Sequence, residues 1–367
     1  MPLQGRFQPT AIGALIVVLI PAALAFFTLS PTVYAQDSAH IETIAGRSFQ
    51  LNFLPAWTFF GCWDTGGDSF ILVDTLRSQV LRYSSHGTLL DDIAGSASLG
   101  GTTITKPSVI IKSSSGLIIE DEDGKLVWLD SAYRQTKTLD LLDIVKNKYE
   151  DLESVWGWVP QSKELLVLGD LKSQAGWYTA LLRVPFQEPS DFEVLQRIEI
   201  SDPARSFYLL GNMYLAVLGE KSYFLSMTDY PSILEFGNLG TKPRILSALK
   251  EMLSVRPLLP EKRGVGSVRE LFRAVERSTM PVSLYGWKDY LYGLVRENSD
   301  DQTHWVLVKI DPRADRIVRK QRIETQAKHV VLIPGPDAWL LVEKGSVLGL
   351  GQQSIDGVRL LPSDLIK

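Results

Sequence analysis

Ile71-Leu72-Val73-Asp74 is an apolar run that ends in a carboxylate and a turn, and it decides the fold because the same unit recurs along the chain. Five further copies lie at residues 117–121, 166–170, 216–220, 293–297 and 340–343. The carboxylates that end the six units are Asp74, Asp121, Asp170, Glu220, Glu297 and Glu343. They step by 47, 49, 50, 77 and 46 residues, and a period of this size in strand-forming units is typical of a β-propeller.

Each unit continues with two more strand-like runs. In the first unit they are residues 79–83 and 88–90, joined by the turn Ser84-Ser85-His86-Gly87. In the fifth unit they are residues 305–310 and 316–323, joined through Asp311-Pro312-Arg313. Short apolar runs separated by Gly, Pro, Asp and Ser indicate strands and hairpins. With one strand before the carboxylate run, each unit becomes a four-stranded blade.

The first unit also carries a family resemblance. Asp74, followed by Arg77-Ser78-Gln79-Val80-Leu81-Arg82-Tyr83 and then Gly87, resembles the repeat of NHL-type six-bladed propellers. The resemblance implies an all-β, six-bladed propeller. Residues 41–54 before the first unit and residues 358–361 after the last are candidates to pair and close the ring.

Two units match each other in their aromatic residues. Trp156-Gly157-Trp158 aligns with Tyr285-Gly286-Trp287, and Trp177 aligns with Trp305. Aromatic residues at equivalent positions usually bury large apolar areas between neighbouring blades. We therefore interpret them as structural rather than as ligand-stacking groups.

The long interval of 77 residues predicts a helical insertion at residues 241–280, between blades 4 and 5. Pro243 precedes an apolar periodicity, and Ser267 with Glu270 forms a capping box before a second helix. The insertion has nine Lys and Arg against four Glu, although the chain as a whole carries a formal charge of −4. We expect its helices to form a lid over one face, a docking surface for an acidic partner or anionic lipid, or simply an ordinary solvated face. The basic residues of that face are Arg269, Arg273 and Arg277.

The N-terminal segment 1–35 predicts a signal peptide, with a retained membrane anchor as the alternative. Arg6 is followed by an apolar run at residues 11–29 that Pro21 interrupts, and Val33-Tyr34-Ala35 fits a signal-peptidase site. Either interpretation exports residues 36–367, which we expect to form a single propeller domain, periplasmic or extracellular or tethered to the outer face of a membrane. Contact with a membrane is expected only through an uncleaved N-terminal segment.

Composition limits the classes of function. The near-neutral charge does not favour nucleic acid as a partner, because that requires a strongly basic face. Cys62 is the sole cysteine, which excludes an intrachain disulfide and favours a buried small hydrophobe. The chain has no Walker loop, dinucleotide fingerprint or Gly-x-Ser-x-Gly motif, and we assign no catalytic residue.

Equivalent positions of successive blades lie around one face, so the six carboxylates predict a rough ring. One interpretation is a rim that binds a cation such as Ca²⁺, which prefers oxygen ligands. The favoured interpretation is that each carboxylate accepts backbone N–H bonds in the turn after its strand. In that case the chain needs no cofactor.

Two functions follow from these alternatives. The first is an exported, non-catalytic propeller that binds a protein or small-molecule ligand on one face. The second is a metal-dependent hydrolase similar to the gluconolactonase-type propellers. That resemblance implies a divalent cation in the central channel, held by Glu, Asp and Asn. Few asparagines are well placed for such a site, because Asn147, Asn212, Asn238 and Asn298 are expected mostly in turns, which favours the binding function.

Overall fold

The computed structural model describes most of the chain after residue 40. The described residues are 41–55, 60–64, 67–96, 104–113, 116–121, 124–146, 149–161, 163–198, 212–226, 232–237, 242–251, 279–299, 302–344 and 355–362. The predicted signal peptide or anchor at 1–35 lies outside them. Within the described part, no helix is both long and apolar enough to cross a membrane.

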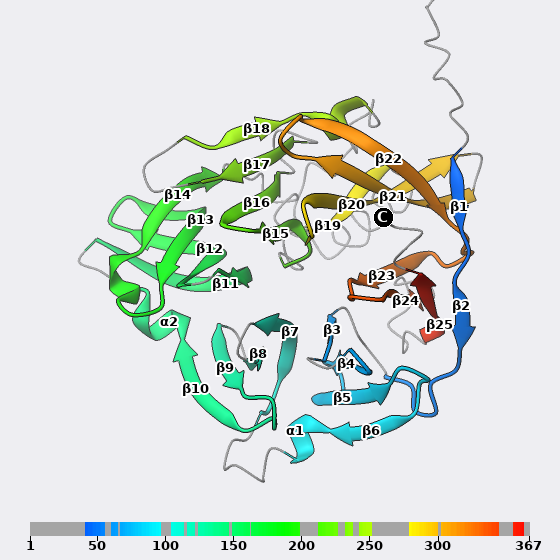
Figure 1. Ribbon diagram of the computed structural model, residues 1–367. Coiled ribbons are helices and arrows are strands. Elements are labelled where there is room, and N and C mark those ends of the chain that lie inside the picture. Colours follow the sequence, from blue (N-terminus) through cyan, green and yellow to red (C-terminus); the bar gives the residue numbers. More distant parts are fainter. Residues whose placement is uncertain are drawn as a thin grey trace, which may run out of the picture. The chain divides into compact units, whose positions relative to one another are not determined.

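Six sheets are arranged in a ring, and each is one blade of a propeller (Figure 1). The blades follow chain order, with the first strand of each blade innermost. Blade 1 contains β3 (Gly61–Trp63), β4 (Ser69–Asp74), β5 (Gln79–Ser84) and β6 (Leu89–Asp92). Blade 2 contains β7 (Pro107–Ser113), β8 (Gly116–Asp121), β9 (Lys125–Leu129) and β10 (Gln135–Asp140). The second and third strands of these blades confirm the units predicted from the repeat.

Blades 3 and 4 continue the same antiparallel order. Blade 3 contains β11 (Glu150–Pro160), β12 (Glu164–Ser173), β13 (Gly176–Pro185) and β14 (Glu193–Ile198). Blade 4 contains β15 (Leu215–Leu218), β16 (Lys221–Ser226), β17 (Ser232–Phe236) and β18 (Arg244–Leu246). Short helical turns accompany the blades as α1 (Ile93–Ser96), α2 (Leu141–Ile144), η2 (Pro189–Asp191) and η4 (Ala248–Glu251).

The last two blades include strands from the N-terminal part of the chain. Blade 5 contains β19 (Met280–Trp287), β20 (Tyr290–Ser299), β21 (Gln302–Asp311) and β22 (Arg316–Ile323), and β1 (Glu42–Ile44) pairs parallel to β22. Blade 6 contains β23 (His329–Ile333), β24 (Ala338–Lys344) and β25 (Ile355–Pro362), and β2 (Arg47–Phe49) supplies its outer strand. Arg47 pairs with Leu360 and Phe49 with Val358, which confirms the predicted ring closure.

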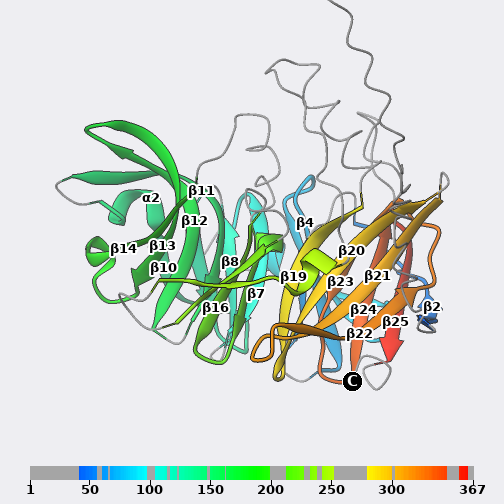
Figure 2. The ribbon, with the colours of Figure 1, turned by 90° about the horizontal axis from the view of Figure 1, so that it is seen from above.

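The core lies between the blades. Leu340, Val342 and Val358 of blade 6 pack in one cluster with Phe70 and Leu72 of blade 1. Burial of such continuous apolar strands on both faces supplies the main stabilisation of the ring. Since all inner strands run in one direction, all second strands end at the same face (Figure 2, upper edge). We call it the second-strand face.

The matched aromatic residues lie between blades, as predicted. Trp158 is fully buried, while Tyr285 and Trp287 contact Trp339 of the next blade at ring-centroid distances of 5.8 and 6.3 Å. At Gly286 an added Cβ would lie 2.0 Å from the Val217 carbonyl oxygen, so only glycine permits this approach of blade 5 to blade 4. Trp177 is the exception, because it is 58% exposed.

The predicted helical insertion at 241–280 is partly wrong. Residues 244–246 form β18, the outer strand of blade 4, and Met280 begins β19. Pairing of β18 with β17 overrides the helical periodicity there, with Leu246 buried and Ile245 exposed. The second predicted helix, including Arg269, Arg273 and Arg277, lies outside the described residues.

Candidate functional site

Five of the six repeated carboxylates come from second strands. Asp74, Asp121, Asp170 and Glu343 are 0 to 7% exposed, and Glu297 is half-buried. Glu220 departs from the prediction, because it lies in the turn between the first and second strands of blade 4 and is exposed. First and second strands are equally apolar in a propeller, so the repeat was assigned one strand too early. The second strand of blade 4 instead ends at Ser226.

Asp74 behaves as the favoured turn interpretation predicts. Its Oδ1 accepts a hydrogen bond from the backbone N–H of Arg77 at 3.2 Å, in the turn after β4. The Arg77 guanidinium also lies 3.7 Å from Oδ2. This carboxylate therefore stabilises its own hairpin.

Asp121 has a different role from the one predicted. Its Oδ1 accepts backbone N–H bonds from Thr105 and Lys106, both at 2.7 Å, and these residues precede the first strand of the same blade. The turn after β8 is instead capped by Glu120, whose Oε1 accepts from the Gly124 N–H at 3.1 Å. Asp121 therefore fastens the incoming chain to the blade.

Asp170 and Glu343 are held by side chains of neighbouring strands. Asp170 accepts hydrogen bonds from the hydroxyls of Ser154, at 3.0 Å, and Thr179, at 2.6 Å. Glu343 pairs with the Arg359 guanidinium, with N–O distances of 3.1 and 3.2 Å. Each partner belongs to the carboxylate's own blade.

Four of the second-strand carboxylates therefore act within their separate blades. Throughout the described part of the chain, no three His, Cys, Asp or Glu side chains gather where they could hold a metal ion. The acidic oxygens that a Ca²⁺ site would need are directed to backbone N–H groups, hydroxyls and a guanidinium in these blades. Among these acids, Asp74 makes the predicted turn interaction, whereas Asp121, Asp170 and Glu343 bind other groups of their own blades.

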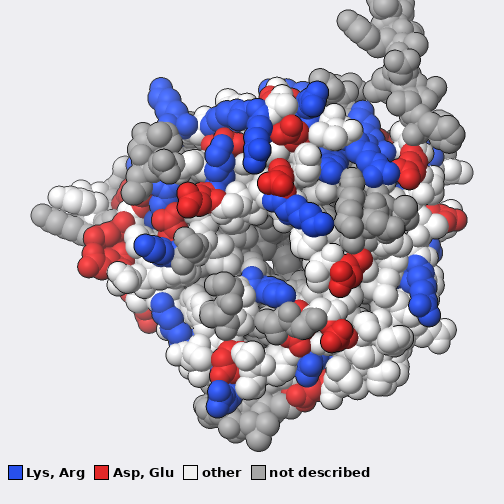
Figure 3. All heavy atoms as spheres, in the orientation of Figure 1, with Lys and Arg blue, Asp and Glu red and all other residues white. Residues whose placement is uncertain are grey.

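The opposite face carries a different arrangement. Lys and Arg side chains gather there over blades 4 and 5 (Figure 3). In blade 5, Lys309 of β21 lies directly opposite Arg319 of β22. Lys288 lies at the tip of the β19–β20 hairpin and acts on the same lysine electrostatically. We call Lys288, Lys309 and Arg319 the blade 5 cation cluster.

Aromatic side chains accompany this cluster. The Lys309 ammonium lies 3.9 Å from the centroid of the Tyr290 ring, and the Lys288 ammonium lies 5.7 Å from that of Trp287. Such contacts are attractive because the ring face is electronegative. Burial, followed by the charges of Arg319 and Lys288, holds the pKa of Lys309 below its ordinary value.

One carboxylate joins the blade 5 cation cluster from the N-terminal strand β1. Glu42 forms an ion pair with Arg319 and accepts a hydrogen bond from Gln321 Nε2 at 3.2 Å. These contacts, led by the hydrogen bond from Arg319, lower the pKa of Glu42. Ring closure thus places a carboxylate beside these cations.

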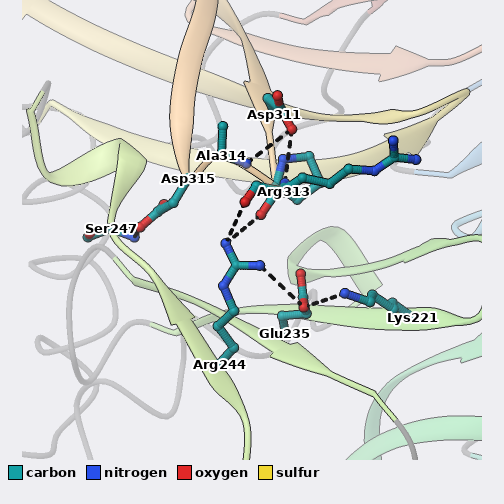
Figure 4. Close-up of polar contacts among 9 residues, drawn as sticks. Lys221, Glu235, Arg244, Ser247, Asp311, Arg313, Ala314 and Asp315 are labelled. Carbon is teal, nitrogen blue, oxygen red and sulfur yellow. Dashed lines mark hydrogen bonds and ion pairs between the residues drawn. The ribbon is translucent and has the colours of Figure 1, made fainter.

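A second group of charges joins blade 4 to blade 5 (Figure 4). Arg244 Nη2 donates to the carbonyls of Pro312 and Arg313 at 2.8 and 3.1 Å. Asp315, with φ of 49°, accepts from the backbone N–H of Ser247 at 2.8 Å and of Ala248 at 3.0 Å. A turn of blade 5 therefore caps η4 of blade 4, and these charges are structural.

Two further basic groups lie near the second-strand face, where Lys344 is buried and His329 is half-buried. Burial lowers the pKa of Lys344 to about 7. Burial, with Arg296 and Lys344 next in importance, lowers the pKa of His329 to about 4. His329 and Lys344 are directly paired across β23 and β24. Lys344 is 1% exposed, so its position affects stability.

The sequence did not indicate the blade 5 cation cluster. Lys309 and Arg319 each occupy an ordinary polar position of an alternating strand. Only the register of β21 on β22 makes them opposite, and only the hairpin at Lys288 brings the third cation. The sequence also gives no indication of the positive φ of 53° at Lys288.

Known structures share the fold. A member of the duf4221 family from Bacteroides vulgatus aligns with a TM-score of 0.51 and 10% identity, covering 88% of this chain and 97% of that one. Regucalcin, a calcium-binding protein from Agrobacterium tumefaciens, aligns at 0.46 and 12% identity, over 88% and 96% of the chains. A luciferin-regenerating enzyme aligns at 0.46 and 13% identity, over 87% and 95%.

No protein-family model and no curated protein matches the sequence. The match to the duf4221 member supports the propeller architecture. At these identities the comparisons concern the fold alone. The function therefore has to be argued from the side chains of this chain.

Proposed function

We propose that this protein is an exported, non-catalytic propeller that binds a protein or small-molecule ligand on one of its faces. Export is inferred from the N-terminal segment, and the folded domain would then act outside the cytoplasm, either free or tethered by that segment. The proposal includes no cofactor and no nucleic acid.

The observation that carries the proposal is that repeated carboxylates interact with groups of the propeller itself. Asp74, Asp121 and Asp170 each accept hydrogen bonds from groups of their own blade. A metal-dependent hydrolase would need several such acids to converge on one cation. Acids that are already engaged in separate blades favour a structural role, and leave the faces of the propeller for binding.

The second-strand face offers one exposed feature that suits a partner. The strands β12 and β13 continue about three residues beyond Asp170, and Trp177 near the tip of this hairpin is 58% exposed. Tryptophan is enriched among the residues that contribute most to binding at protein interfaces. If the segment with Arg269, Arg273 and Arg277 is the predicted docking helix, it would supply a second, basic feature.

A lactone-hydrolysis assay tests the proposal against the hydrolase alternative. The purified mature domain would be assayed with gluconolactone in the presence of Ca²⁺ or Zn²⁺. We expect no turnover above the uncatalysed rate. Metal-dependent turnover that Asp170→Asn abolishes, in a variant that still folds, would contradict the proposal.

A further inference from the structure

Trp177 differs from its counterpart in the repeat. That counterpart, Trp305 of blade 5, is 2% exposed and donates a hydrogen bond from its indole Nε1 to the Ala327 carbonyl at 2.8 Å. Trp177 is 58% exposed, and the Lys172 ammonium lies 5.6 Å from the centroid of its ring. The core of the propeller does not use Trp177, which points to a role at the surface.

A second aromatic ring is exposed at the same end of blade 3. Tyr149 directly precedes β11 and is 63% exposed. Glu150, the next residue, pairs with Ser173 of β12, which in turn pairs with Gly176 of β13, next to Trp177. The backbones of Tyr149 and Trp177 are therefore about two strand spacings apart across the sheet, roughly 10 Å. We call Tyr149 and Trp177 the blade 3 aromatic pair.

The projecting end of blade 3 is a rigid support for this pair (Figure 2, upper left). Tyr178 of β13 donates a hydrogen bond to the carboxylate of Glu150. The Arg197 guanidinium lies 4.2 Å from the centroid of the Tyr178 ring and 3.6 Å from the Glu150 carboxylate. These contacts join β11, β13 and β14 at the end of the blade. A ring on a rigid support loses little freedom when a ligand binds, which favours affinity.

Polar side chains beside Trp177 supply both donors and acceptors. Lys172 lies directly opposite Trp177 across β12 and β13, and its ammonium is 3.6 Å from the carboxylate of Glu153. The side chains of Lys172 and Glu153 are 54% and 33% exposed, so a ligand can reach both. Since the ammonium and the carboxylate offset each other, they suit neutral hydroxyl groups, which donate and accept hydrogen bonds.

The size of the projecting end indicates which ligand fits. It extends about three residues along the strands and two strand spacings across them, roughly 10 Å by 10 Å of sheet. A standard protein interface buries about 800 Å² on each partner, which is far more than this end offers. A few linked sugar rings match it better. The C–H groups on the face of a pyranose ring carry partial positive charge, and the face of an aromatic ring is electronegative.

We propose that the blade 3 aromatic pair binds an uncharged oligosaccharide of β-linked pyranose units. One sugar ring stacks on Trp177 and another on Tyr149, while Lys172 and Glu153 form hydrogen bonds with the hydroxyl groups. A β-linked chain is an extended ribbon, so it can reach two aromatic rings at one end of a sheet. The proposal names the ligand class for this exposed part of the second-strand face. It deepens the binding function proposed above and rests on it.

Isothermal titration of the mature protein with cellohexaose, and with the hexamer of N-acetylglucosamine, tests the site. We expect saturable binding of at least one hexasaccharide and weaker binding of the corresponding disaccharide, which offers fewer rings for stacking. Trp177→Ala and Tyr149→Ala should each weaken binding about tenfold, because each removes one aromatic contact.

Two further variants make the result specific. Leu76→Ala is the matched control, because it removes an exposed apolar side chain of the same face in blade 1, 60% exposed, and should bind sugar as the wild type does. Trp177→Phe keeps an aromatic ring and should bind more tightly than Trp177→Ala. All four substitutions are at exposed positions, and circular dichroism checks folding.

Three results would overturn the site. The first is no saturable binding of either hexasaccharide to the wild type. The second is equal binding by Leu76→Ala and the two variants of the aromatic pair. The third is sedimentation with phosphatidylcholine vesicles that Trp177→Ala abolishes, without any binding of sugar, which would indicate contact with a membrane. The proposed function fails on a different result, lactone turnover, so the two failures are distinguishable.

Discussion

At the residue scale, the acids that end the second strands serve local structure. Asp121 is fully buried and accepts two backbone N–H bonds at 2.7 Å from Thr105 and Lys106. A buried donor left without its acceptor costs far more than an average hydrogen bond contributes. These acids therefore recur because each blade has to satisfy its own polar groups, and the partners differ from blade to blade.

The Asp121→Ala substitution should lower the free energy of unfolding by about 2 to 3 kcal/mol, because two buried N–H groups lose their acceptor. Urea unfolding measures the change. Glu220→Ala is the matched control, since this acid of the same repeat is exposed, and its effect should stay within about 0.5 kcal/mol. If the two substitutions lowered the free energy of unfolding equally, the burial of Asp121 would not explain its contribution to stability.

Lys344 gives a pH dependence with a defined sign. Burial lowers its pKa from 10.5 to about 7, so between these values the unfolded chain binds more protons than the folded one. The free energy of unfolding should therefore rise from pH 7 towards pH 9, by up to about 1 kcal/mol per pH unit. Urea unfolding at several pH values should give a smaller slope for Lys344→Met, whereas Lys163→Met should leave it unchanged. An unaltered slope in Lys344→Met would refute the buried-lysine account.

At the element scale, the sequence predicts where strands lie. It does not predict which strand of a blade each apolar run forms. The runs at 79–83 and 316–323 are strands β5 and β22 with almost the predicted bounds. Glu220 was misplaced because β15 and β16 are both apolar, and strand order within a blade depends on pairing across the sheet. Residues 244–246 have a helix-like periodicity in the sequence. That periodicity does not reveal their pairing with β17, which makes them a strand.

Pairing between blades also explains the contact at Asp315. Its carboxylate caps η4 from the neighbouring blade, through Ser247 and Ala248. Asp315→Ala should lower the free energy of unfolding by about 1 to 2 kcal/mol, as loss of a helix cap does, and thermal unfolding measures it. Asp289→Ala, in the adjacent exposed ion pair, should have almost no effect. A comparable loss in both variants would mean that the cap is unimportant.

At the scale of the whole molecule, the six-bladed ring and its closure followed from the repeat and from the two ends of the chain. The pairing of β2 with β25 was expected, whereas the parallel addition of β1 to blade 5 was not. That addition brings Glu42 to Arg319, so ring closure contributes to the blade 5 cation cluster. Long-range register of this kind is set by the closed ring and leaves no local signal in the sequence.

The repeated carboxylates interact within the blades of the propeller, and we propose that they hold no catalytic cation. A bound metal raises the melting temperature by mass action, about 2.7 kcal/mol of stability at a hundredfold excess over the dissociation constant. The direct measurement is the melting temperature of the mature domain with Ca²⁺, with Zn²⁺ and with a chelator. We expect the same melting temperature in all three conditions. A rise with either metal that the chelator reverses would contradict it.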